Sequence, residues 1–142
     1  AAPPAPPAAT PAAERGAGER VLVVEDEAAV RSLISTVLGT SGYAVRAAES
    51  GDEAVRALEE STYDLVISDL RMPGLDGEGL YEQVRQRWPH LQRRLLFISG
   101  DIEADRFAAR LREHDVRYLE KPFTAARLLV TVREVLDAAA TT

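Results

Sequence analysis

Acidic, hydroxyl and basic side chains follow four short apolar segments of this chain, each at the point where the segment ends. The segments are rich in Val, Ile and Leu, which is typical of buried β-strands. The polar residues that follow them are Glu25 and Asp26, Asp69, Ser99 and Lys121. Because open α/β sheets bind ligands at the carboxyl ends of their strands, we expect these side chains to share one crevice.

The chemistry of this crevice follows from its charges. Carboxylates from Glu25, Asp26 and Asp69 would repel one another, so some of them would have to take up a proton or a cation. Oxygen ligands of this kind suit Mg²⁺. Lys121 adds a positive charge and Ser99 adds a hydroxyl, a combination that favours phosphoryl transfer, which depends on positioning and charge neutralisation. Asp69 is then the expected nucleophile, forming an aspartyl phosphate.

Five strands, each followed by a helix, are needed to position these residues. The strands are predicted at residues 21–24, 43–48, 65–67, 95–98 and 117–120. The first helix carries Val30, Leu33, Ile34, Val37 and Leu38 at the spacing of one buried face. Ser50 to Glu53 has the form of a capping box, and Thr124 is the expected N-cap of the last helix.

This alternation predicts the α/β class, with a parallel sheet covered by helices on both faces. Right-handed crossovers leave few topologies. We expect the flavodoxin-like three-layer (βα)5 sandwich with strand order 2-1-3-4-5, which puts the first and third strands side by side. Residues 1–18 read as a Pro/Ala-rich flexible linker, 19–138 as the folded domain and 139–142 as a C-terminal tail.

Composition excludes several classes of protein. The 142 residues include 17 Lys and Arg against 23 Asp and Glu, a formal charge of −6, which disfavours direct binding to nucleic acid. The longest apolar runs are too short to span a membrane, so we expect no membrane contact. The absence of Cys fits a reducing, cytoplasmic environment.

The four polar segments resemble the receiver domain of two-component response regulators. The matching stretches are 21–27, 67–74, 97–100 and 118–123, and the likeness extends from about Arg20 to Asp137. The resemblance implies that Asp69 is phosphorylated and that Asp26, Asp69 and the backbone carbonyl of Arg71 ligate Mg²⁺ directly. Glu25 is implied to act through water, and Lys121 to pair with the acceptor carboxylate and then with the phosphoryl group.

The resemblance also implies a switch. Ser99 would move toward the phosphoryl oxygen and Tyr118 would swing inward behind it, repacking the fourth helix (about 103–113), the last strand and the fifth helix. Arg71 and Asp101 occupy the positions that tune the lifetime of the phosphoryl group. Where the family often has two aspartates this chain has Glu25 and Asp26, and Ser99 stands at a position that is commonly Thr.

For function, the resemblance implies a phosphoacceptor in a phosphorelay, not an enzyme beyond self-catalysed phosphorylation and dephosphorylation. The phosphodonor would be a histidine kinase or a histidine phosphotransfer domain, and the face of the fourth helix, last strand and fifth helix could form a homodimer. The linker at the start favours the C-terminal receiver of a hybrid histidine kinase. A stand-alone single-domain response regulator and a phosphorylation-independent interaction module are the alternatives.

Other readings of the same residues are weaker. An FMN carrier would need a phosphate loop where Glu25 to Glu27 stand, and no P-loop sequence is present. A phosphohydrolase of the haloacid dehalogenase type would need an acid at position 28, which is Ala. Taken alone, the acids at 25–27 could serve only the start of the first helix. His90 and His114 read as a loop residue and a helix-end residue, not as phosphorelay histidines.

Overall fold

Eleven helices and strands make up the part of the chain that the computed structural model describes, residues 15–100 and 106–140. None of the helices in these residues is long and apolar enough to cross a bilayer. The strands are β1 (Arg20–Val24), β2 (Ala44–Ala48), β3 (Leu65–Asp69), β4 (Leu95–Ser99) and β5 (Arg117–Glu120). The helices are α1 (Ala28–Thr40), α2 (Gly51–Glu60), α3 (Gly77–Arg87), the 3-10 helix η2 (Pro89–Leu91), α4 (Arg106–Glu113) and α5 (Ala125–Ala140).

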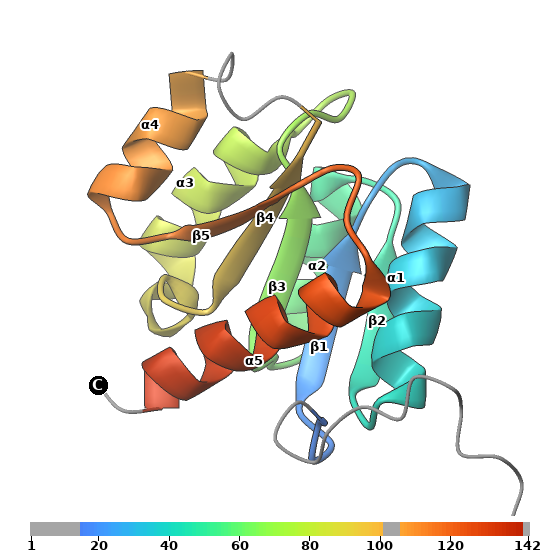
Figure 1. The fold of residues 1–142 in the computed structure, drawn as a ribbon. Helices are drawn as coiled ribbons and strands as arrows, with labels where there is room; N and C mark the ends of the chain where they lie inside the picture. The colour runs from blue at the N-terminus through green and yellow to red at the C-terminus, as the bar shows by residue number, and fades with distance from the viewer. Residues whose placement is uncertain (1–14, 101–105, 141–142) are drawn as a thin grey trace, which may run out of the picture.

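The strands form one parallel sheet in the order β2-β1-β3-β4-β5, which confirms the predicted flavodoxin-like topology. Figure 1 shows α1 and α5 on one face of this sheet and α2, α3 and α4 on the other. The burial of the strands agrees with this order, because β3 in the centre is buried at every position while β2 at the edge is mostly exposed.

Two apolar layers hold the helices to the sheet. Because successive strand residues point to opposite faces, Leu22 and Val24 pack with α2 and α3, whereas Val21 and Val23 pack with α1 and α5. Each fully buried aliphatic side chain of this kind contributes roughly 1.5–3 kcal/mol. The strands are therefore fixed from both sides, and so are the residues at their ends.

Some details differ from the prediction. Leu33 was expected on the buried face of α1, but it is 52% exposed while Ile34 beside it is fully buried. Consecutive residues of a helix lie about 100° apart, so Leu33 falls at the flank of the stripe that Ile34 and Leu38 define. The Ser50 hydroxyl accepts from the Glu53 amide as expected, but the Glu53 carboxylate accepts from the amide of Glu49, not from that of Ser50.

Candidate functional site

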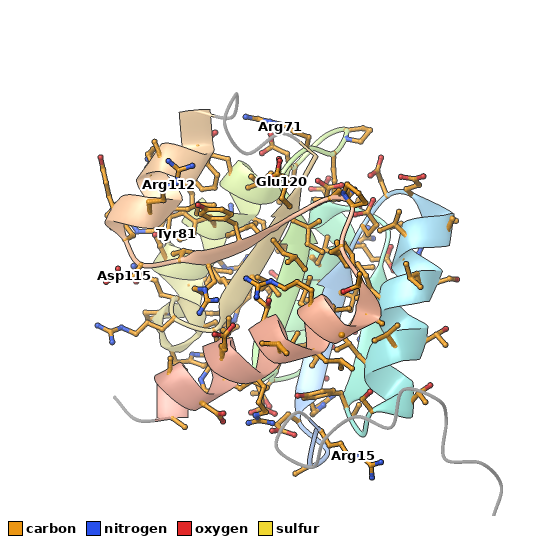
Figure 2. All side chains as sticks on the ribbon, in the orientation of Figure 1. Arg15, Arg71, Tyr81, Arg112, Asp115 and Glu120 are labelled. Carbon is orange, nitrogen blue, oxygen red and sulfur yellow. The ribbon has the colours of Figure 1, made fainter. Side chains whose placement is uncertain are left out.

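The carboxyl ends of four neighbouring strands bring the predicted polar residues to one edge of the sheet. Glu25 follows β1 directly, Asp69 ends β3, Ser99 ends β4 and Lys121 follows β5. In Figure 2, Arg71 and Glu120, the last residue of β5, mark this edge. The predicted convergence of acids, hydroxyl and ammonium is therefore present in the fold, since parallel strands in register end together.

The loop after β3 is held in place by close backbone contacts. A Cβ on Gly77, the first residue of α3, would lie 2.6 Å from the carbonyl oxygen of Asp69, and one on Gly51 would collide with the carbonyl of Leu75. Asp76 caps α3 by accepting from the Gly79 amide at 3.0 Å. The starts of α2 and α3 thus press on the loop and leave Asp69 little freedom.

Three carboxylates form the centre of the site. Glu25, Asp26 and Asp69 each offer an oxygen, and these oxygens all lie within 4.8 Å of one another. Glu25 and Asp69 are buried while Asp26 is exposed, so the cluster opens to solvent on the side of Asp26. The Oε2 atom of Glu25 is buried and accepts no hydrogen bond from the described residues. A hard cation would satisfy this oxygen, and the all-oxygen donor set suits Mg²⁺.

Lys121 reaches into this cluster from β5. Its Nζ atom donates to Asp69 Oδ2 at 2.9 Å and lies 3.6 Å from Glu25 Oε2. Burial alone would lower the pKa of Lys121, but the hydrogen bond to Asp69 and the charges of Asp69 and Glu25 raise it overall. The second Asp69 oxygen, Oδ1, accepts from the Arg71 amide at 3.2 Å. Both oxygens of the central carboxylate are therefore held.

The negative charge that Lys121 does not neutralise affects the protonation of Glu25. Its burial, together with a hydrogen bond to Asp69 and the negative charge of Asp69, raises its pKa from 4.5 to about 7. Lys121 and the amide of Glu27 act in the opposite direction but do not compensate. Without a cation, the cluster consequently retains a proton on Glu25 up to neutral pH.

The other predicted residues lie around this centre. Ser99 is buried, and its carbonyl accepts from the Lys121 amide at 2.8 Å; the Lys121–Pro122 peptide bond that follows is cis. The Arg71 side chain is exposed and pairs with Asp76 at 3.4 Å. Tyr118 is half-buried against the α2–α4 core layer, and its hydroxyl accepts from Arg112 Nε at 3.1 Å. Asp101 lies outside the described residues.

Some contacts at the site had no signal in the sequence. Arg31, on α1, donates to the carbonyl of Glu25 at 3.0 Å and to that of Asp26 at 3.4 Å. These hydrogen bonds hold the backbone that carries the two acids. An arginine on a polar helix face reads as a solvated residue. Arg112 was equally unmarked, because its partner Tyr118 belongs to the next strand.

A flavodoxin-like sheet with clustered acids, a hydroxyl and a lysine at its carboxyl edge defines an aspartate phosphoacceptor domain. The family described as the response regulator receiver domain matches residues 21–133. The chain belongs to this family, as the resemblance in its sequence predicted.

Several known proteins are similar to the chain over most of its length. It is 39% identical to the response regulator protein FleR of Pseudomonas aeruginosa and 40% identical to the sensor kinase CckA of Brucella abortus. These alignments cover 78% and 82% of the chain but only 23% and 12% of those proteins. The chain is also similar to a crystal structure of NtrX from Brucella abortus, with a TM-score of 0.79 and 28% identity. This match covers 87% of the chain and 28% of the NtrX chain. The chain thus spans less than a third of each of these three relatives.

Proposed function

We propose that Asp69 accepts a phosphoryl group from a phosphohistidine in a Mg²⁺-dependent reaction. The observation that supports this most is the hydrogen bond from Lys121 Nζ to Asp69 Oδ2 inside the carboxylate cluster. In the transfer, an Asp69 oxygen forms a bond to phosphorus while the bond from phosphorus to the donor's imidazole nitrogen breaks. The electron pair of that bond stays on the imidazole, so no further reactant is needed.

The residues that would hold Mg²⁺ are Glu25, Asp26, Asp69 and the carbonyl of Arg71. Their donor set and the buried Oε2 atom of Glu25, which accepts no hydrogen bond from the described residues, fit a hard cation. When bound, the ion supplies positive charge that neutralises the acids and the phosphoryl oxygens. Lys121, which follows β5, contributes the second positive charge, and the Arg71 amide orients the Asp69 carboxylate for attack.

The parent protein and the partners belong to the same proposal. The phosphodonor is a histidine kinase or a histidine phosphotransfer domain in the cytoplasm. The similarity to a sensor kinase and the Pro/Ala-rich start support a hybrid histidine kinase whose receiver spans 19–138, between a linker at 1–18 and a tail at 139–142. Activity beyond self-catalysed phosphorylation and dephosphorylation would then lie outside this domain. The α4-β5-α5 face would carry a homodimer contact.

The proposal is tested with the small phosphodonor phosphoramidate. Intact-mass spectrometry should detect a gain of one phosphoryl group in the presence of Mg²⁺ and none after chelation with EDTA. Uptake that is equally fast with and without the ion would argue against the metal-dependent reaction. Loss of the added mass on alkaline treatment is expected of an acyl phosphate.

For output, we infer a switch that links the phosphoryl group to the α4-β5-α5 face through Ser99 and Tyr118. Arg71 and Asp101 would set the lifetime of the phosphorylated state. Tyr118 is held on its present side by Arg112, so the ring must leave this hydrogen bond to move inward. The phosphoryl group adds a charge of about −1.5 to −2 at pH 7, and this charge biases the α4-β5-α5 face toward its switched packing.

Replacing Ser99 by Ala is expected to separate phosphorylation from switching. The chain should still gain the phosphoryl mass, because Asp69 and Lys121 are unchanged, but Tyr118 should keep its resonance positions when the phosphoryl mimic beryllofluoride is added. NMR of the tyrosine side chains measures this. Ser99→Thr, which keeps the hydroxyl, serves as the control and should respond. A full response of the Ala variant would rule out the role of Ser99.

A further inference from the structure

The chain entering the domain is bound to its surface at residues 15–19. The Gly16 amide donates to the Ser41 carbonyl at 2.8 Å, and the Gly18 amide donates to the Gly42 carbonyl at 2.9 Å. The carbonyl of Glu19 then accepts from the Ala44 amide at 2.9 Å, directly before the β1–β2 pairing starts. We call residues 15–19 the strap. These backbone hydrogen bonds tie the strap to the turn that precedes β2.

Two glycines allow this close approach. A Cβ on Gly16 would lie 2.6 Å from the ring of Tyr43, and a Cβ on Gly42 would lie 2.5 Å from the carbonyl oxygen of Gly16. Gly42 also has φ +96°, a conformation that side chains disfavour. The strap therefore lies backbone against backbone on the turn between α1 and β2, where a side chain at either glycine would displace it.

Arg133 of α5 closes over the strap. Its guanidinium donates to Glu19 Oε2 at 2.7 Å and to the Arg15 carbonyl at 3.3 Å. It also donates to the Tyr43 hydroxyl at 3.5 Å and to Asp137 at 3.0 Å. The side chains of Arg133 and Glu19 are only 20% and 21% exposed. This ion pair is therefore partly shielded from water, unlike an ordinary surface pair.

The strap and the phosphoacceptor site lie at opposite ends of the sheet, and α5 connects them. Figure 2 labels Arg15 at one end and Arg71 at the other. The first turn of α5 follows Lys121, and Arg133 comes about 12 Å further along its axis. A helix transmits a displacement of one end to the other, and the Arg133 guanidinium already donates to four acceptors. A shift of α5 would thus lengthen these bonds.

We propose that the strap is a mechanical joint through which α5 controls how the preceding Ala- and Pro-rich chain leaves the domain. The joint rests on the proposed function, because a phosphoryl group at Asp69 is what displaces α5. This displacement withdraws Arg133 from Glu19 and thereby loosens the strap. Coupling between two sites is reciprocal. Loosening the strap should therefore also strengthen the binding of a phosphoryl mimic at Asp69.

Amide hydrogen exchange at Gly16 and Gly18, read by NMR on the full chain, tests the joint. Arg133→Gln should speed exchange at both amides about tenfold, by loss of the shielded hydrogen bonds. Glu19→Gln should also speed exchange at both amides, and it changes no residue of α5. Arg46→Gln, which removes an exposed ion pair between β2 and Glu60, is the matched control and should leave both amides unchanged. Unchanged exchange in Arg133→Gln and Glu19→Gln would overturn the joint.

The coupling is tested by adding Mg²⁺ and beryllofluoride to the wild-type chain. The Arg71 amide reports on the site and the Gly16 and Gly18 amides report on the strap. We expect the Arg71 resonance to shift and exchange at the two glycines to become severalfold faster. A shifted Arg71 with unaltered glycines would overturn the coupling and leave the phosphoacceptor function in place. An unchanged Arg71 amide would overturn both.

Discussion

A chain carrying Asp69→Asn is expected to gain no phosphoryl group from phosphoramidate, whatever the concentration of Mg²⁺. The carboxamide is a poor nucleophile, and it offers Lys121 Nζ no charged partner in place of the present 2.9 Å hydrogen bond. The substitution should not unfold the protein, since it removes one of three carboxylates that repel one another. Intact-mass spectrometry measures the uptake, and circular dichroism verifies the fold.

The same variant has an electrostatic consequence that can be measured separately. Burial is the largest cause of the raised pKa of Glu25 and Asp69 is the next, so the pKa of Glu25 should fall below about 7 in Asp69→Asn, while burial continues to raise it. Asp52→Asn is the matched control, because Asp52 is an exposed acid at the start of α2 that takes no part in the cluster. It should take up the phosphoryl group as the wild type does. Wild-type uptake by Asp69→Asn would end the assignment of the acceptor.

Without a divalent cation, the protein should lose stability as the pH rises from about 4.5 to 7. The folded state holds a proton on Glu25 up to about pH 7, while the unfolded chain releases it near 4.5. The stabilisation is therefore fully present below about pH 4.5, where both states are protonated, and it is lost as the pH rises from about 4.5 through the folded pKa of about 7, by up to about 3 kcal/mol. Urea denaturation at fixed ionic strength in EDTA measures this as the difference between wild type and Glu25→Gln.

Mg²⁺ should reverse this dependence of stability on pH. Binding of the cation competes with the proton on Glu25, so the stabilisation by Mg²⁺ should be larger at pH 8 than at pH 5.5. Glu25→Gln should retain binding through Asp26 and Asp69 but lose most of the pH dependence. Equal stabilisation by Mg²⁺ at the two pH values would contradict the coupling of the metal to Glu25.

The strands and the residues at their ends could be predicted because they depend on local patterns, whereas the strand order was a choice among the few topologies that right-handed crossovers allow, and the structure confirms it. Leu65 to Ile67 form an apolar run typical of a buried strand, and Asp69, two residues beyond Ile67, was therefore expected at the carboxyl edge, where it ends β3. The misplacement of Leu33 shows the limit of this reasoning. A periodic pattern gives the direction of a buried stripe, but the width of the stripe depends on how closely the neighbouring elements pack.

Long-range polar contacts were out of reach for another reason. Arg133 and Glu19 stand 114 residues apart, and nothing in either sequence neighbourhood marks the other as a partner. The same holds for Arg31, whose hydrogen bonds to the backbone of Glu25 and Asp26 depend only on where α1 packs. Such contacts are consequences of the fold, whereas the acids and Lys121 are tied to strand ends that the pattern itself predicts.

The most direct test is to locate the phosphoryl group after reaction with phosphoramidate and Mg²⁺. Fragmentation of the peptides should place the added mass on Asp69 alone, with no modification of peptides containing His90 or His114. Attachment to either histidine, with an unmodified Asp69, would contradict the central claim that the acids of β1, the aspartate of β3 and Lys121 form one phosphoacceptor site.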